Sequence, residues 1–312
     1  MNSQEIKNTL SPIIQGDLDI EEKTLQNYSR DASLFEIKPQ VVIFPKNSAD
    51  IKTIVKWVAE NKKANPDLSI TARSAGTDMS GGAINHSIIL DFTRYMNKIL
   101  SVENHVGTAE PGCFYRDFEK ETLKQNWFMP AYTASREICA LGGMAANNSG
   151  GENTIRYGKV EDFINHLKII LSDGEEYLIK PLTKTELEQK INQNDFEGNL
   201  YKEIYNLIFE NQTKIKTAKP KVSKNSAGYY LWNVWDEDKQ IFDLNKLIVG
   251  SQGTLGIITE IGFKLVEKPA YASLLAIFMP SIEKLPEVVN EIMAFKPGSL
   301  ETYDDYSLKL AI

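Results

Sequence analysis

The residue types best suited to binding chemistry lie in a glycine-rich stretch at residues 73–83, RSAGTDMSGGA. Three glycines are interspersed with serine, threonine and aspartate, between an apolar run that ends near Ala72 and another that begins at Ile88. Glycine permits positive φ and a close approach of the main chain to a ligand, so successive N–H groups in such a loop can hold an anion. We expect a strand, an anion-binding loop and a second strand here. The alternative is a mobile surface turn.

Two further glycine-rich stretches favour the binding interpretation. Residues 141–158, LGGMAANNSGGENTIRYG, carry five glycines among small and polar side chains. Residues 250–256, GSQGTLG, lie between two apolar runs, as the first stretch does. Side chains this small leave little bulk between the backbone and whatever lies above it, and they cannot form a core by themselves. We therefore expect all three stretches to contact a ligand.

The elements that must position these loops follow a mixed pattern of helices and strands. After a helical lead-in over residues 1–15 come a strand at 41–45 and a helix capped by Asn47 or Ser48, with Ile51, Ile54, Val55 and Val58 on one stripe. Strands are expected at 68–72, 87–92, 98–103 and 106–112, on both sides of 250–256 within 245–269, and at 272–280; helices at 113–126, 184–213 (stripe Leu200, Ile204, Leu207, Ile208) and 281–295; and a hairpin at 163–180 about Asp173-Gly174. This order predicts an α+β fold with antiparallel content rather than a doubly wound sheet.

Composition excludes several classes of function. The 312 residues carry a net charge of −7, which argues against a nucleic-acid surface. Two cysteines and three histidines show no metal-ligand spacing, so we expect no metal site. No apolar run of ~18 residues could span a bilayer, and the N-terminus lacks a signal-peptide pattern. We expect a cytoplasmic protein.

Six motifs in one order resemble a known family. They are PQVVIFP with the following helix, RSAGTDMSGGA, AEPG, LGGMAANNSGG with RYG, SDGE, and VGSQGTLGIITE. Together they resemble the FAD-linked oxidases and dehydrogenases of the vanillyl-alcohol oxidase and p-cresol methylhydroxylase (PCMH) type, in the branch of glycolate oxidase flavin subunits and D-lactate dehydrogenases. The resemblance covers about residues 28–269. It agrees with the lack of a GxGxxG fingerprint for nicotinamide cofactors.

The resemblance implies an organisation into three parts. Residues 1–35 would be a helical lead-in, residues 36–269 a PCMH-type FAD-binding domain of two α/β subdomains, and residues 270–312 the start of a truncated C-terminal cap domain. We expect the chain to be a fragment, or to be completed by another chain, because the family's cap supplies most substrate-binding side chains. Such a fragment could be inactive alone.

The resemblance also implies where FAD would be held. The first loop would wrap the pyrophosphate, the second stretch would line the ribityl chain and the isoalloxazine ring, and the third would close over the adenine or flavin side. The implied residues are Arg73, Ser74, Ala75, Gly76, Thr77 and Ser80 in the first loop; Gly142, Gly143, Ala146, Asn147 and Ser149 in the second, with Pro130 and Tyr132 nearby; and Gly253, Ile257 and Ile258 in the third.

Several residues depart from the family pattern. The first loop has no histidine to tether FAD, so we expect non-covalent FAD. Asp78 stands where many relatives have glycine, and an acidic side chain beside a pyrophosphate is unfavourable unless it points away. Gln252 stands where glutamate is common. Cys139 lies too close to the Gly-Gly pair to match the flavin-linked cysteine of some relatives, and is interpreted as a small buried side chain.

The expected function is oxidation of a 2-hydroxy acid of the D-lactate or glycolate type by hydride transfer to flavin N5. No histidine falls in a motif, so the catalytic base is unassigned. Lys224, Arg136 and Arg156 are weak candidates for binding a substrate carboxylate, and Tyr229 either faces the flavin or belongs to the core. An electron-acceptor protein or a quinone could reoxidise the flavin, with the protein peripheral at the inner membrane face. The alternatives are another substrate, namely an alditol, a phenol or a cell-wall sugar, and a non-catalytic flavin-binding subunit.

Overall fold

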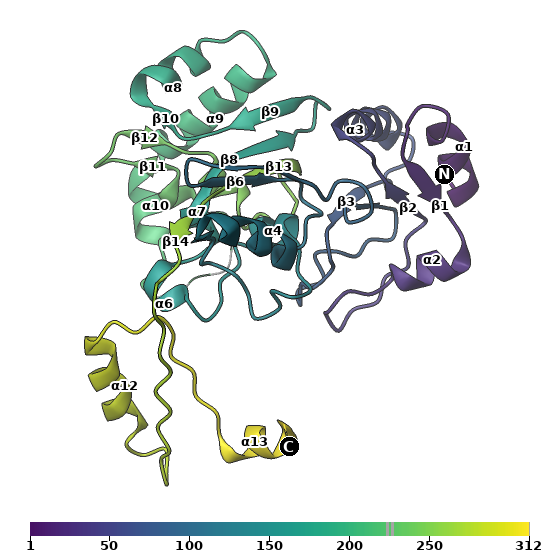
Figure 1. Cartoon of the computed structure of the whole chain (residues 1–312). Coiled ribbons are helices and arrows are strands. Elements are labelled where there is room, and N and C mark those ends of the chain that lie inside the picture. The colour runs from purple at the N-terminus through teal and green to yellow at the C-terminus, as the bar shows by residue number, and fades with distance from the viewer. Residues whose placement is uncertain (223–224, 226–227, 312) are drawn as a thin grey trace.

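The computed structural model describes residues 1–222, 225 and 228–311. Two sheets stand side by side, each with its own helices, and a terminal segment, residues 270–311, extends away from both (Figure 1). This mixture of helices and strands, without a doubly wound sheet, confirms the predicted fold class. Within the described residues no helix is both long enough and apolar enough to cross a membrane.

The first subdomain is built on a four-stranded sheet in the order β1-β2-β4-β3. Its strands are β1 (Asp17–Asp19), β2 (Val41–Phe44), β3 (Ile70–Arg73) and β4 (Ile88–Asp91). Strands β2 and β3 run parallel to β4, and β1 is antiparallel to β2. Because side chains alternate across a strand, Val41 and Ile43 join the core with α1 (Ser3–Leu10) and α3 (Ser48–Lys62), while Val42 and Phe44 pack on α2 (Glu22–Asn27).

Helix α3 joins the two subdomains. Its N-cap residue Asn47 accepts a hydrogen bond from the Asp50 N–H through Oδ1 (3.0 Å), as predicted. Ile51 and Ile54 are fully buried, and the other two residues of the predicted stripe are partly buried against the same core. That core also includes Ile170 and Ile257 from the second sheet. The two sheets therefore share apolar packing around α3.

The second subdomain is built on a five-stranded antiparallel sheet in the order β5-β6-β13-β8-β9. Its strands are β5 (Ile99–Glu103), β6 (Val106–Ala109), β8 (Ile164–Ile170), β9 (Glu176–Ile179) and β13 (Ile257–Lys264). Strands β8 and β9 form the predicted hairpin. Helix α4 (Tyr115–Thr122) packs Phe118 on Phe263 at a ring separation of 5.9 Å, and α8 (Lys184–Ile191) and α9 (Phe196–Glu210) extend the same core.

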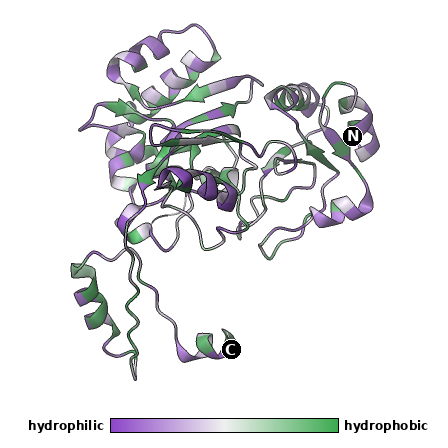
Figure 2. Ribbon diagram, in the orientation of Figure 1, coloured by the Kyte–Doolittle hydropathy of each residue, from purple (hydrophilic) through white to green (hydrophobic). Residues whose placement is uncertain are grey.

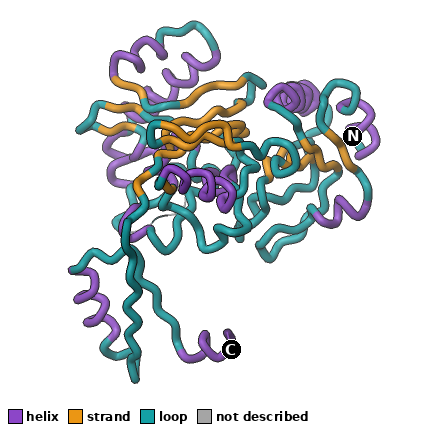
Figure 3. The backbone as a smooth tube through the Cα atoms, viewed as in Figure 1, coloured by secondary structure: helices purple, strands orange, loops and turns teal. Residues whose placement is uncertain are grey.

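Shorter elements connect these layers (Figure 3). Strand β7 (Trp127–Phe128) pairs with β14 (Val266–Glu267), and a separate three-stranded sheet has the order β10 (Leu182–Thr183), β12 (Ile241–Phe242), β11 (Trp235–Asp236). The 3₁₀ helices are η1 (Leu123–Gln125) and η2 (Leu231–Asn233). The remaining helices are α5 (Leu141–Ala146), α6 (Thr154–Tyr157), α7 (Val160–Phe163), α10 (Gln212–Ala218), α11 (Asn245–Ile248), α12 (Leu285–Ala294) and α13 (Asp305–Ala311).

Three predicted elements are wrong in detail. The run before the third loop is the helical turn α11 rather than a strand, and it follows a local turn in which the Asp243 carboxylate accepts the Asn245 N–H (3.0 Å). Helix α4 begins at Tyr115, which leaves Phe114 as its N-cap. Leu207 on α9 is 47% exposed, although the other residues of its predicted stripe pack in the core.

The terminal segment has helices but no strand. Residues 272–280 are extended and pair with no described strand, so the strand predicted there is wrong. Helix α12 has Pro286 in its first turn, as predicted. Figure 2 shows apolar residues along α12 and the extended stretch before it, away from the two sheets. Leu274 and Phe278 are each more than nine-tenths exposed.

Candidate functional site

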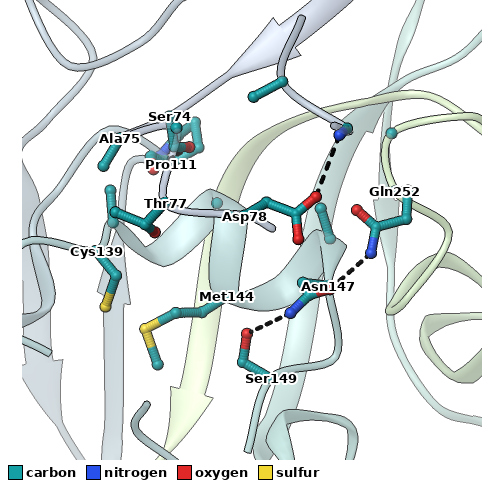
Figure 4. A pocket seen from close by; sticks show the side chains of 18 of the residues that line it. Ser74, Ala75, Thr77, Asp78, Pro111, Cys139, Met144, Asn147, Ser149 and Gln252 are labelled. Atoms are coloured by element: carbon teal, nitrogen blue, oxygen red, sulfur yellow. Dashed lines mark hydrogen bonds between the residues drawn. The ribbon is translucent and has the colours of Figure 1, made fainter. Parts of the chain in front are cut away.

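A cavity of about 430 Å³ lies where the three glycine-rich stretches meet (Figure 4). Its walls come from the loop after β3 in the first subdomain, and from α5, the loop behind it and the loop before β13 in the second. The predicted residues that line it are Ser74, Ala75, Gly76, Thr77, Gly142, Gly143, Ala146, Asn147, Ser149, Gly253 and Ile258. The tertiary structure thus gathers residues nearly 200 positions apart around one volume.

The first loop presents free main-chain donors. From Ser74 to Gly81 no main-chain N–H group donates a hydrogen bond to any described residue. Gly76 and Gly81 have φ of +66° and +83°, which bulkier residues rarely adopt. A run of unpaired N–H groups at a cavity wall is the arrangement that holds an anion such as a diphosphate.

Arg73 supports this loop from beneath and does not line the cavity. Its Nη1 donates to the Ala83 carbonyl (3.3 Å), and its guanidinium lies 5.0 Å from the Tyr28 ring centroid. A Cβ on Gly76 would stand 2.6 Å from Nη2 of Arg73, and the φ of +66° is one that L side chains rarely adopt, so a substitution there would be strained. Burial lowers the pKa of Arg73. The partly buried guanidinium therefore supports the first loop through its hydrogen bond to Ala83.

Ser74, Pro111 and Gly142 form the junction between the first loop and α5. The Pro111 carbonyl accepts hydrogen bonds from the Ser74 hydroxyl (3.0 Å) and the Gly142 N–H (2.8 Å). A Cβ on Gly142 would stand 2.6 Å from the Pro111 Cβ and 2.7 Å from the Ser74 Oγ. Only glycine at 142 lets the two cavity walls approach this closely.

The third loop closes the carboxyl end of α5. Gly250 and Gln252 donate their N–H groups to the carbonyls of Ala145 (3.0 Å) and Ala146 (2.9 Å). Helix carbonyls at this end lack partners within the helix. The loop therefore satisfies them and fixes the distance between the second and third glycine-rich stretches.

Asn148 is a residue of the second loop that the sequence reasoning passed over in favour of Asn147. It has a φ of +47°, is 3% exposed, and accepts the Glu161 N–H through Oδ1 (3.0 Å). Its Nδ2 has no hydrogen-bond partner among the described residues. Asn148 does not line the cavity, so this buried donor lies within the protein, next to the lining residues Asn147 and Ser149. Its position before Ser-Gly-Gly was the available signal, since asparagine tolerates left-handed backbone.

Five predicted binding residues do not line the cavity: Arg73, Ser80, Pro130, Tyr132 and Ile257. Ser80 is exposed, and Ile257 belongs to the core around α3. Pro130 and Tyr132 are buried behind the neighbouring residues 133–135, which do line it. Burial and a hydrogen bond to the Glu152 carboxylate (2.5 Å) raise the pKa of Tyr132 to about 12, so this phenol stays protonated.

Ionisable groups are scarce on the cavity wall. Among the described residues that line it, none is a histidine, lysine or arginine, and the only carboxylate is that of Asp78. Cys139 lines the cavity and is buried, as predicted, and burial raises its thiol pKa. His86, His105 and His166 instead contact the Asp67 carbonyl, the Trp127 ring, and the Asn165 and Glu260 side chains.

The weak candidates for binding a substrate carboxylate are not brought to the cavity. The Arg136 guanidinium lies over the Tyr132 ring, and that of Arg156 over the Tyr157 ring. Lys224 lies outside the described residues. Tyr229 donates to or accepts from Thr254 Oγ1 of the third loop (2.7 Å) and is 46% exposed, so it is not a core residue. In the described part of the chain no group of three or more His, Cys, Asp or Glu side chains could hold a metal ion.

The site fits a dinucleotide with a flat ring. The volume lies in the range of ordinary ligand pockets, and the first loop offers main-chain donors for a diphosphate. Glycine and alanine on α5 leave space that a branched side chain would occupy.

Sequence comparison identifies the domain. Residues 39–179 match the family model described as an FAD binding domain. The chain is 27% identical over 285 residues to D-2-hydroxyglutarate dehydrogenase of Escherichia coli (strain K12), covering 91% of this chain and 28% of that protein. It is 28% identical to the glycolate oxidase subunit GlcD of Bacillus subtilis (90% and 49% covered) and 26% identical to a D-lactate dehydrogenase of Anaerostipes hadrus (83% and 42% covered).

The chain therefore spans less than half the length of each of these relatives. Among solved structures it is similar to alkyldihydroxyacetonephosphate synthase, with a TM-score of 0.58 and 18% identity over 86% of this chain and 41% of that one. That likeness supports the fold. Together the comparisons confirm the predicted fold and the predicted FAD cofactor.

Proposed function

Because residues 39–179 are an FAD-binding domain and the chain belongs to the PCMH-type family of FAD-linked oxidases and dehydrogenases, we propose that it takes part in oxidising a 2-hydroxy acid. The observation that carries this proposal is the cavity lined by three glycine-rich stretches, with unpaired N–H groups from Ser74 to Gly81. When bound, FAD would supply the acceptor for the substrate's hydride.

The chain's own residues would bind and orient the cofactor. The main-chain N–H groups of the first loop would hold the diphosphate. The close contact of Ser74, Pro111 and Gly142 would set the separation of the two walls. We propose non-covalent FAD, because no histidine is among the described residues that line the cavity and burial raises the pKa of the Cys139 thiol.

The substrate's proton acceptor and the cation for its carboxylate would come from residues that do not line this cavity. The described lining has no histidine, lysine or arginine to serve either role. We propose a D-lactate or glycolate type of substrate, an electron-acceptor protein or quinone as oxidant, and a cytoplasmic location, peripheral at the inner membrane face.

The test is the visible absorption spectrum of the purified chain before and after acid precipitation, followed by anaerobic addition of D-lactate, glycolate or D-2-hydroxyglutarate. We expect a flavin spectrum, release of the flavin into the acid supernatant, and bleaching by one of the hydroxy acids. A colourless protein that takes up no added FAD would overturn the cofactor assignment for this chain. Flavin that stays with the precipitate would overturn the non-covalent proposal.

A second candidate follows from the same lack of basic side chains in the lining. In that case the chain binds FAD without turning over a hydroxy acid by itself. Full FAD binding with no bleaching by any hydroxy acid, combined with normal photoreduction of the bound flavin, would favour it.

A further inference from the structure

Asp78 places a carboxylate on the wall of a cavity that otherwise offers main-chain donors. Its Oδ2 accepts hydrogen bonds from the Ser80 hydroxyl (2.5 Å) and the Gly82 N–H (3.2 Å), while Oδ1 has no hydrogen-bond partner among the described residues. The side chain is thus turned back onto its own loop and held there. It does not extend along the unpaired N–H groups from Ser74 to Gly81, so it leaves them available for a diphosphate.

Gln252 faces Asp78 from the third loop, and its orientation is set by a chain of side-chain hydrogen bonds (Figure 4). Its Nε2 donates to Oδ1 of Asn147 (2.7 Å), whose Nδ2 donates in turn to the Ser149 hydroxyl (3.3 Å). The side-chain N–H groups of Gln252 and Asn147 thus both donate to residues of the second loop. The Gln252 Oε1 is therefore left as an acceptor on the side of Asp78.

The two acceptors converge over one glycine. A Cβ on Gly82 would stand 2.9 Å from Oε1 of Gln252 and 3.0 Å from Oδ2 of Asp78. Because no lysine or arginine lines the cavity in the described part of the chain, nothing there neutralises the carboxylate. A phosphate at this point would meet only repulsion. A ligand that covers these oxygens and displaces their water must instead bring hydroxyl or amino donors.

We propose that Asp78 and Gln252 form an acceptor pair for the two hydroxyls of the adenosine ribose of FAD. A vicinal diol offers two adjacent O–H donors, and carboxylates accept ribose hydroxyls in the NAD sites of the unrelated Rossmann fold. This assignment lays the adenosine half of the cofactor between the first and third loops, and the diphosphate on the free N–H groups of the first loop. It rests on the proposed function, because it presumes that FAD occupies this cavity.

The experiment measures dissociation constants of the apoprotein by flavin fluorescence, with three probes: FAD, FMN, and FAD built on 2′-deoxyadenosine. Because hydrogen bonds to charged groups are the stronger ones, we expect Asp78→Ala to weaken FAD about tenfold or more, and Gln252→Ala to weaken it several-fold. FMN lacks the adenosine, so its affinity should change less than about twofold. The deoxy analogue should lose less affinity than FAD does when Asp78 is removed.

Asp117→Ala is the matched control, since it removes an exposed carboxylate that does not line the cavity. It should change FAD binding less than about twofold, and thermal melts should show that all variants fold. If Asp78→Ala binds FAD as tightly as the wild type or more tightly, or weakens FAD and FMN alike, the acceptor pair is wrong. If the wild-type chain binds neither FAD nor FMN, the proposed function itself fails, and the inference fails with it.

Discussion

Two phenylalanines show how differently the body of the molecule (residues 1–269) and the terminal segment (residues 270–311) use apolar sequence. Phe118 on α4 is fully buried and packs on Phe263, with the ring centroids 5.9 Å apart. Phe278 is 92% exposed and belongs to none of the core clusters. The two residues are chemically identical. The difference shows that an apolar side chain stabilises a fold only where other elements supply a surface against which it can pack.

The same contrast holds for whole elements. Residues 41–44 and 272–280 are both apolar runs, and both are predicted strands. Strand β2 has hydrogen-bonded neighbours on either side and helices over both faces. Residues 272–280 have no strand neighbour among the described residues and stay extended. Strand formation thus depended on available partners rather than on composition.

The largest expected effect comes from truncating the two phenylalanines. Phe118→Ala should lower the free energy of unfolding of the body by about 3–5 kcal/mol, because it removes buried apolar contacts and leaves a cavity. Phe278→Ala, its matched control, should change it by less than about 0.5 kcal/mol. Urea unfolding followed by tryptophan fluorescence would measure both. Equal losses would show that the terminal segment packs on the body in solution.

A smaller effect is expected from adding a methyl group to a glycine in each region. Gly142→Ala places a Cβ against Pro111 and Ser74, so it should cost about 1–3 kcal/mol and weaken FAD binding by separating the cavity walls. Gly298→Ala meets no atom within 4 Å and should change stability by less than about 0.5 kcal/mol. Thermal melts and FAD titration would measure the difference. If Gly142→Ala binds FAD as tightly as the wild type, the close contact of Gly142 with Pro111 and Ser74 does not set the separation of the cavity walls.

The smallest effect concerns pH. Hydrogen bonds from Lys52 and Lys56 of α3 lower the pKa of Glu175, in the β8–β9 turn, from near 4.5 to about 2. A lowered pKa in the folded state contributes stability above pH 4.5, and this contribution is lost as the pH falls toward 2. Glu175→Gln should therefore be slightly less stable than the wild type at pH 6, and the difference should vanish near pH 2. High salt should reduce it, because the pairs are exposed.

Asp304 of the terminal segment is the matched control for this pH effect. A hydrogen bond from Ser307 lowers its pKa within the segment itself. Asp304→Asn should leave unfolding of the body unchanged at every pH, because no contact with the body depends on it. A difference as large as that of Glu175→Gln would show that the two regions unfold together.

Much of the candidate site could be read from residue types. Gly76 and Gly250 have left-handed backbone, and Gly142 lies close to Pro111 and Ser74. Glycine is the residue that suits both situations, so its occurrence indicates such positions without coordinates. The helix stripe at Ile51 and Ile54 follows from periodicity in the same way. The role of Arg73 as a support beneath its loop could not be read, since it depends on Tyr28 and Ala83, which fold over it.

Local sequence was enough to define the α+β pattern, the three glycine-rich loops and a helix cap at Asn47 or Ser48, because backbone preference and side-chain periodicity act over a few residues. It was not enough to leave residues 272–280 without a partner among the described strands, or to bring Asp78 and Gln252 over Gly82. Those outcomes depend on contacts between residues far apart in the chain. Asp78 and Gln252, for example, lie on loops of different subdomains, and the two sheets share a core around α3.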